Sequence, residues 1–459
     1  MKNSIKREQS QTGLSFAERE KFRPQVKRII SERFVTYAAN EKWPSTARIT
    51  IKMCDAIDQA LLQDALAATQ QRYPYFCVRF RITNGDDGRE YFALEENPQP
   101  WVMQPTSKPA CLMGPESNDH LLAFACWDDS FAIDFFHGLT DGAGAYHVLR
   151  TLTYEYCRRR YDSQLSREGL RVAGDDISPE EWTDPASLPR PENLKPIPVP
   201  AMPRPLNLRK EAAVPHRDGV ESVFIQIDEK QVMEYVAAHG TTPATLLSLL
   251  LARAVGRLHP DGGDAAPSVA LAINQRPALG TPQACQSLMS GINLLLNSEV
   301  RHLPIDEQLT AFRSQIVTQL NPDNVLADFY GFKERMDQLE MLPTIAARRQ
   351  AMAALGDMAD IMGTCGLSYV GKANFGAAER YVREMFAEVS SPFELLFEVS
   401  AISGKFDITV LYHFTTDAYL DAFIDEARQI GLSVIIISRR PLQVAPITAF
   451  YTTDNNKVR

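Results

Sequence analysis

The chain has little of what marks a nucleic-acid-binding or membrane-spanning protein. It contains 48 Lys and Arg against 57 Asp and Glu, a formal net charge of −9, and no long run of basic residues. Nucleic-acid binders gain affinity by neutralising phosphates with basic side chains. The most apolar stretches, 246–255 and 432–438, are too short for a bilayer, which takes about 20 residues. We therefore expect no nucleic-acid partner and no integral membrane segment.

Cysteines are few and show no pairing pattern. The seven are odd in number and never form a Cys-x-x-Cys motif. Disulfide scaffolds are dense in cysteine and zinc sites place their ligands close together, so neither is indicated. The first 30 residues also lack the apolar core of a signal peptide. We expect a cytoplasmic protein.

The size of the chain indicates more than one domain. It has 459 residues, 45% hydrophobic and 23% charged, which is typical of globular proteins, and single cores stop growing at roughly 250–300 residues. Eight prolines lie between positions 185 and 205. They exclude a helix or a central strand there, because proline lacks an N–H donor and fixes φ. We expect an N-terminal lobe at 1–185, a Pro-rich connector at 186–215 and a C-terminal lobe at 216–459.

Both halves are predicted to mix strands and helices, which gives an α/β fold class. Period-two and period-3.6 patterns and turn residues set the boundaries. In the first half we expect strands at 47–53, 76–82, 90–94, 120–126 and 130–136, a helix capped by Asp58, and a helix at 142–160. In the second half we expect strands at 222–227, 268–273, 367–370, 393–401, 406–412 and near 447–452. Helices are expected there at 244–258, after the cap Thr242, at 418–431, and within a charged stretch at 306–355.

The most informative stretch is FAIDFFHGLTDGAGAYHVLR, residues 131–150. An apolar strand leads into His137, and Asp141 and Gly142 then open an amphipathic helix. Asp141 suits a helix N-cap, worth about 1 kcal/mol, and a histidine at a strand end is often structural. Yet the imidazole lies at the mouth of a strand, four residues before a carboxylate that fixes the turn. Because histidine exchanges protons near neutral pH, the pattern favours His137 as a general base.

Two other kinds of site, a metal site and the nucleophile of a serine hydrolase, are less well supported by the sequence. His137, His147 and Asp141 do not complete a close-spaced metal-ligand set, so we expect no metal. The segment 366–371, GLSYVG, has one residue too many for the Gly-x-Ser-x-Gly nucleophile elbow of a serine hydrolase.

HGLTDG resembles the HxxxDG motif of the chloramphenicol-acetyltransferase-like superfamily of CoA-dependent acyltransferases, which includes condensation domains. Further segments are similar to that family in the same order: LLQDALAATQQRYPYFCVRF (61–80), the helix at 242–258, ALAINQRPAL (270–279), and GLSYVG. Within the superfamily the chain looks most like the bacterial alcohol-acetyltransferase-like branch. Phe136 and Tyr369 depart from common family residues, and no DFGWG motif is present.

The resemblance implies a fold of two lobes, each a mixed β-sheet with flanking helices, and an active-site tunnel between them. It implies transfer of an acetyl or other acyl group from acyl-CoA, a co-substrate, to a small-molecule hydroxyl or amine acceptor, with no permanently bound cofactor. His137 would be the general base. Asp141 would pair with Arg276 of the other half, and Gly142 would keep the approach to the tunnel open. Ser368 would donate a hydrogen bond to the tetrahedral oxyanion.

Two alternatives remain at this stage. A stand-alone condensation-type enzyme would take its acyl group from an acyl carrier protein. A non-catalytic member would keep the fold only to bind a partner. The presence of His137, Asp141, Gly142 and Arg276 favours catalysis.

Overall fold

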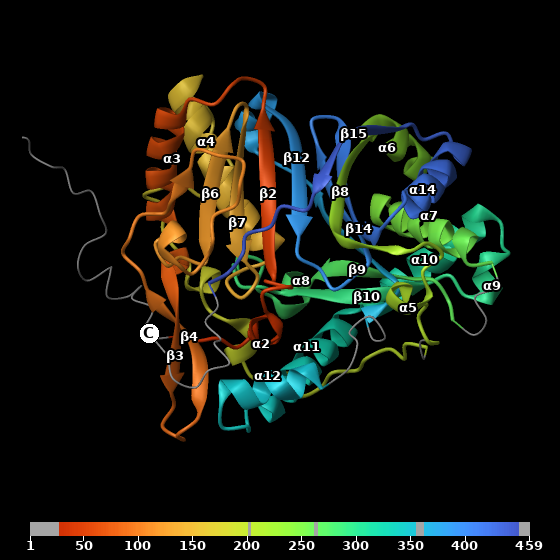
Figure 1. Ribbon diagram of the computed structural model, residues 1–459, viewed down its shortest axis with the longest axis horizontal. Coiled ribbons are helices and arrows are strands. Elements are labelled where there is room, and N and C mark those ends of the chain that lie inside the picture. Colours follow the sequence, from red (N-terminus) through yellow and green to blue (C-terminus); the bar gives the residue numbers. More distant parts are fainter. Residues whose placement is uncertain (1–26, 201–202, 261–264, 355–361, 449–459) are drawn as a thin grey trace, which may run out of the picture.

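The computed structural model describes residues 27–200, 203–260, 265–354 and 362–448. Within these residues the strands form three sheets, of five, seven and three strands. The first two are splayed beside each other, and the helices α11 and α12 run beneath them (Figure 1).

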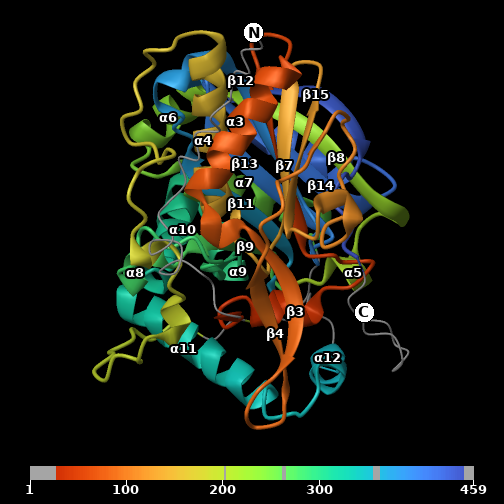
Figure 2. The ribbon, with the colours of Figure 1, turned by 90° about the vertical axis from the view of Figure 1, so that its left-hand side faces the viewer.

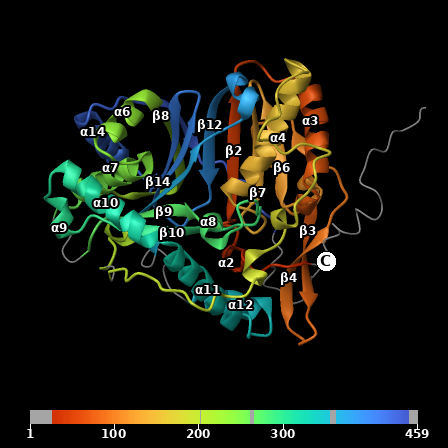
Figure 3. The ribbon, with the colours of Figure 1, turned by 180° about the vertical axis from the view of Figure 1, so that it is seen from behind.

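The five-stranded sheet has the order β12-β2-β7-β6-β5. Its strands are β12 (Val382–Val389), β2 (Thr46–Met53), β7 (Ser130–Phe136), β6 (Leu122–Trp127) and β5 (Met103–Gln104). Neighbours are antiparallel except β5 and β6. Helices α3 (Gln59–Arg72) and α4 (Gly142–Arg160) lie side by side on one face of this sheet (Figure 3).

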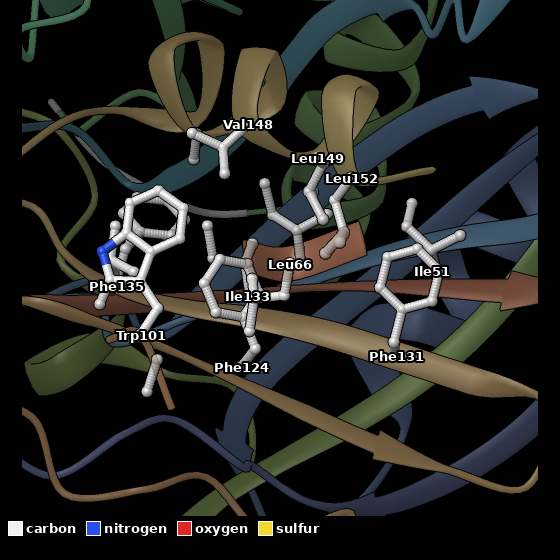
Figure 4. Close-up of a cluster of buried hydrophobic side chains, with 14 of the residues drawn as sticks. Ile51, Leu66, Trp101, Phe124, Phe131, Ile133, Phe135, Val148, Leu149 and Leu152 are labelled. Carbon is white, nitrogen blue, oxygen red and sulfur yellow. The ribbon is translucent and has the colours of Figure 1, made fainter. Parts of the chain in front are cut away.

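Burial of one stripe of α4 against this sheet forms the first core. Val148, Leu149 and Leu152 point from the helix toward Ile133 and Phe135 of β7 (Figure 4). Each of these side chains is essentially inaccessible to solvent, and burying one contributes about 1.5–3 kcal/mol. This packing holds the helix that starts just after the His137 turn.

The seven-stranded sheet has the order β10-β9-β11-β13-β14-β8-β15. Its strands are β10 (Met289–Leu295), β9 (Ser268–Asn274), β11 (Cys365–Lys372), β13 (Leu395–Ile402), β14 (Lys405–Phe414), β8 (His216–Asp228) and β15 (Val434–Pro441). β11 runs parallel to β9 and β13, and the other pairs are antiparallel. The second core packs one face against helices α6 (Glu229–Ala238), α7 (Pro243–Leu258), α10 (Ile305–Gln319) and α14 (Ala418–Gln429).

The third sheet packs against helices from both halves of the chain. The hairpin of β3 (Val78–Asn84) and β4 (Glu90–Glu96) extends below the first sheet, and β1 (Lys27–Arg28) adds a third strand (Figure 2). A separate apolar cluster joins this hairpin to α2 (Arg33–Ala38), α11 (Pro322–Leu339) and α12 (Ile345–Ala353). Two helices of the charged stretch at 306–355 thus pack against elements from the first half of the chain.

Most predicted elements are confirmed, but three long strands and several short elements were not predicted. No strand was expected at β10, β12 or β15, and no helix at α2 or α6. The remaining short helices are α5 (Leu208–Glu211), α8 (Arg276–Leu279) and α9 (Ser298–Arg301). Of the strand expected near 447–452, Ile447 forms a single bridge with Leu112, and 449–452 lies outside the described residues.

β12 crosses from one half of the chain to the other. It pairs with β2, so a strand from beyond the Pro-rich segment completes the first sheet. If the chain is divided into two lobes at residues 186–215, β12 belongs to the second lobe by sequence but to the sheet of the first lobe. This division into lobes remains a proposal. Among the described helices, none has the length and apolar character to cross a membrane.

Candidate active site

His137 follows directly on the buried strand β7. Its backbone N–H donates to the carbonyl of Ser45 at 2.8 Å, and its ring meets that of Phe135 edge-on at 5.4 Å. A turn starts here, since the N–H of Leu139 donates to the carbonyl of Phe136. At Gly138 an added Cβ would lie 2.1 Å from the Phe136 ring, so only glycine fits this turn.

The imidazole of His137 lies deep in the protein yet keeps some accessible surface. Burial lowers its pKa below the usual 6.5, while Asp141 and the backbone of Thr140 act in the opposite direction. Its Nδ1 is buried and has no hydrogen-bond partner among the described residues. A neutral ring is the form that a general base requires.

The ion pair expected between Asp141 and Arg276 is present. Both side chains are buried, and two hydrogen bonds of 2.8 and 2.9 Å join the guanidinium to the two carboxylate oxygens. Asp141 also caps α4, because its Oδ1 accepts from the N–H of Gly144, and its Oδ2 accepts from the N–H of Leu288. Such a bidentate, fully bonded pair fixes geometry in a way that one bond cannot.

Arg276 extends this network into the second half of the chain. Its guanidinium also donates to the carbonyls of Ala284 and Gln286 and to the Asn274 side chain. The segment around residue 285 therefore lies against the start of α4. The Thr140 hydroxyl donates to the carbonyl of Cys285 at 2.6 Å, which adds a second connection.

The two glycines at the start of α4 have opposite surroundings. A Cβ on Gly144 would lie 2.0 Å from Thr140 Oγ1 and 2.5 Å from the carbonyl oxygen of Cys285. A Cβ on Gly142 would meet nothing within 4 Å. Gly144 thus allows the two halves to approach, while Gly142 borders open space.

Ser368 lies on β11 of the other sheet. Its neighbour Leu367 belongs to the second core, so Ser368 projects from the opposite face of the strand. Helix α4 lies near the end of this strand, because the Tyr146 hydroxyl accepts from the Asn374 N–H and its ring meets Phe375 at 5.3 Å. Ser368 therefore belongs to the seven-stranded sheet, whereas His137 follows a strand of the five-stranded one.

One residue that the sequence analysis missed lies beside Ser368. Glu398 of β13 is its register partner, and the Ser368 hydroxyl favours the ionised carboxyl. Burial has the larger effect and raises the pKa of Glu398 to about 7. The signal was present, since Glu398 is the only charged residue in the mostly apolar strand Leu395–Ile402.

His147, the second histidine of α4, does not join the site as a proton carrier. Burial and four arginines, at positions 171, 150, 276 and 72, lower its pKa to about 3. Within the described residues, no group of three or more His, Cys, Asp or Glu side chains is placed to hold a metal ion.

This chain is similar to known proteins in its structure but not in its sequence. No family model and no curated protein matches its sequence. TRI101 of F. sporotrichioides, solved with coenzyme A and T-2, has a TM-score of 0.59 at 13% identity, covering 90% of this chain and 99% of its own. The condensation domain of the monacolin K polyketide synthase MokA has a TM-score of 0.55 at 14% identity, covering 88% and 97%. Polyketide synthase associated protein 5 of Mycobacterium tuberculosis has 0.56 at 12%, covering 89% and 99%.

At these identities the likeness establishes the fold alone. The chain has a two-lobed α/β fold like that of TRI101 and of the MokA condensation domain. The fold class expected from the sequence is therefore confirmed.

Proposed function

We propose that this chain is an acyltransferase that moves an acetyl or other acyl group from acyl-CoA to a hydroxyl or amine acceptor. The observation that carries the proposal is His137, a buried imidazole whose pKa is lowered and whose Nδ1 is unpartnered. The turn that holds it is fixed by the Asp141–Arg276 pair. Several solved proteins of this fold were complexed with coenzyme A or ethyl coenzyme A, which supports the donor.

In this proposal His137 acts as general base without a covalent acyl-enzyme. Its ring takes the proton from the acceptor O–H or N–H while the freed lone pair attacks the thioester carbonyl carbon. The carbonyl oxygen becomes an oxyanion, for which Ser368 on the opposite sheet is the candidate donor; one such donor contributes roughly 3–4 kcal/mol. Collapse of the intermediate breaks the C–S bond, and the imidazolium returns its proton to the leaving thiolate.

Asp141, Arg276 and Gly142 have supporting roles in this proposal. The ion pair leaves no carboxylate oxygen of Asp141 free for substrate, since its oxygens also accept from Gly144 and Leu288. It positions the turn instead. Gly142 would border the path of the donor, which agrees with the open space beside it. Membership of the alcohol-acetyltransferase-like branch and a cytoplasmic location are also part of the proposal.

An acyl carrier protein is the second candidate donor. The condensation domain of MokA shares the fold across nearly the whole chain, and this supports a donor held on a carrier. The donor chemistry at His137 would be the same in both cases, because either donor presents a thioester.

The experiment measures thiol release from acetyl-, butyryl- and palmitoyl-CoA with a panel of alcohols and amines. We expect acceptor-dependent release that falls at least about 100-fold in His137→Ala. His147→Ala is the matched control, since it removes a histidine from the same helix region. No release from any CoA thioester or carrier-bound acyl group by the folded protein would favour the non-catalytic reading. Unchanged release in His137→Ala would refute His137 as the base.

A further inference from the structure

Three polar side chains form a row across neighbouring strands of the seven-stranded sheet. Ser368 on β11 is the register partner of Glu398 on β13, and Glu398 is the register partner of Thr409 on β14. Residues opposite one another in paired strands project from the same face of the sheet. The three side chains are therefore neighbours on one surface.

That surface is the one turned toward the first sheet. The residues flanking the row, Leu367, Phe397, Val399, Ile408 and Val410, point the other way into the second core. On the same face as the row, Asp407 accepts from the N–H of Met385 of β12 at 2.8 Å. The rings of Phe224 and Phe386 also meet there at 5.0 Å. The row thus faces the boundary between the lobes.

Folding alone does not explain these polar groups. No basic side chain pairs with Glu398 among the described residues, and the Oγ1 of the fully buried Thr409 has no partner. By contrast, Asp407 on the same face accepts from Gln226 and Met385. A buried polar atom without a partner costs roughly 1–3 kcal/mol, so the row destabilises the protein as it stands.

Two members of the row are accessible, while Thr409 is fully buried. Ser368 and Glu398 keep part of their surface exposed, although burial dominates the pKa of Glu398. The same combination of depth and remaining accessibility is found at His137. Ser368, Glu398 and His137 thus share a largely covered position that retains accessible surface.

We propose that Glu398 binds a hydrogen-bond donor of the acceptor other than the group that is acylated, with the buried Thr409 hydroxyl behind it, while Ser368 keeps its role toward the oxyanion. The proposal rests on the acyltransferase function and names the acceptor class: a molecule with a second hydroxyl or an ammonium group. A carboxylate accepts from both, and an ammonium would also supply the missing positive charge. An alcohol with no second donor would leave the row unsatisfied.

The test compares binding of 1-hexanol, 1,6-hexanediol and 6-amino-1-hexanol by saturation-transfer NMR, with no acyl donor present. We expect the diol and the amino alcohol to bind wild-type protein about tenfold more tightly than hexanol. Glu398→Leu should abolish both preferences. Glu398→Gln keeps an acceptor oxygen without charge, so it should retain the preference for the diol and lose that for the amino alcohol. These two arms separate a hydroxyl ligand from an ammonium ligand.

Two further variants control for structural damage. Thr409→Val removes the unpartnered hydroxyl without changing charge, and we expect it to weaken the diol preference about threefold. Glu388→Gln changes a buried carboxyl that already pairs with Arg440, and it should leave all three affinities unchanged. If Glu398→Leu fails to fold, the binding preferences of Glu398→Gln and Thr409→Val test the proposal instead.

Equal binding of the three alcohols to the wild type, or an unchanged preference in the Glu398 variants, would overturn the proposal. Because no acyl donor is used, this result is distinct from a failure of acyl transfer in the His137 assay. A protein that prefers the diol through Glu398 but releases no thiol would overturn the acyltransferase function while upholding the site.

Discussion

The turn that carries Asp141 and the strand pair that carries Glu398 both lie at the boundary between the lobes, and each holds a buried carboxyl. Asp141 accepts four hydrogen bonds, two of them from Arg276. Glu398 lies between two hydroxyl-bearing residues, Ser368 and Thr409, and no cation pairs with it in the part of the chain that the structure describes. One carboxylate is satisfied by the protein itself, and the other is left for something else to satisfy.

The difference separates a structural role from a binding role. A carboxylate with every lone pair occupied positions its surroundings but offers nothing to a ligand. An unsatisfied carboxylate contributes nothing to stability, and it is retained where its interaction comes from a bound molecule. The predictions below test this distinction through stability, from the largest expected effect to the smallest.

Removing the cation from the satisfied pair should have the largest effect. Arg276→Ala leaves Asp141 buried without its charge partner, and we expect a loss of about 3–5 kcal/mol in the free energy of unfolding, measured by urea denaturation. The exposed pair Arg204–Glu211 provides the control, because Arg204→Ala should cost less than about 1 kcal/mol. A loss at Arg276 no greater than at Arg204 would contradict the structural role of the pair.

Removing the charge from the unsatisfied carboxyl should stabilise the protein increasingly as the pH rises from 4.5 to 7, and fully above pH 7. The pKa of Glu398 is raised from 4.5 to about 7 in the folded state, so the folded protein holds this proton more tightly than the unfolded chain. Stability from this group is present below pH 4.5 and is lost as the pH rises through 7. The total loss is up to about 3 kcal/mol.

The comparison of wild type with Glu398→Gln isolates this effect. Asp134 and Asp407 also have pKa values raised to about 7, but they are present in both proteins. The variant should be the more stable protein at pH 8, and the difference should shrink as the pH falls to 4.5. A Glu398→Gln variant that is less stable than wild type at pH 8 would show that the carboxylate is satisfied after all.

The same distinction explains what could be predicted from the sequence. The satisfied half of the site follows from local patterns: Asp141 occupies a helix N-cap, as its spacing to α4 predicts, and the motif resemblance identified Arg276 as its partner. His137 and its turn are likewise local, because β7 and α4 adjoin in the sequence. The assigned catalytic roles of His137 and Ser368 remain predictions.

Two of the missed parts, β12 and the role of Glu398, depend on contacts between distant residues. β12 (VREMFAEV) shows no regular alternation of apolar and charged residues, and its partner β2 lies more than 300 positions away. Glu398 is the only charged residue of its strand, but its surroundings are defined only when β11 and β14 place Ser368 and Thr409 on either side of it. No local pattern shows that its charge lacks a partner, because that fact belongs to the assembled sheet.

The smallest expected effect on stability comes from substitutions of Gly142 and Gly144. These two glycines of α4 also contrast a crowded position with an open one. Gly144→Ala places a methyl group 2.0 Å from Thr140 Oγ1 and 2.5 Å from the backbone oxygen of Cys285. The helix start must shift away from the second half of the chain, and overpacking of this kind costs about 1–3 kcal/mol. Urea denaturation measures this loss.

Gly142→Ala meets nothing within 4 Å, and its stability should equal or slightly exceed that of the wild type, because alanine favours a helix. Its effect should fall on function instead: the methyl group would narrow the open space beside the helix start and raise the KM for acyl-CoA severalfold. The two variants should thus have different defects: Gly144→Ala should lose stability, and Gly142→Ala should lose affinity for acyl-CoA. If Gly142→Ala changed neither quantity, the open space beside it would not lie on the donor's path, and the donor would have to reach His137 from another side.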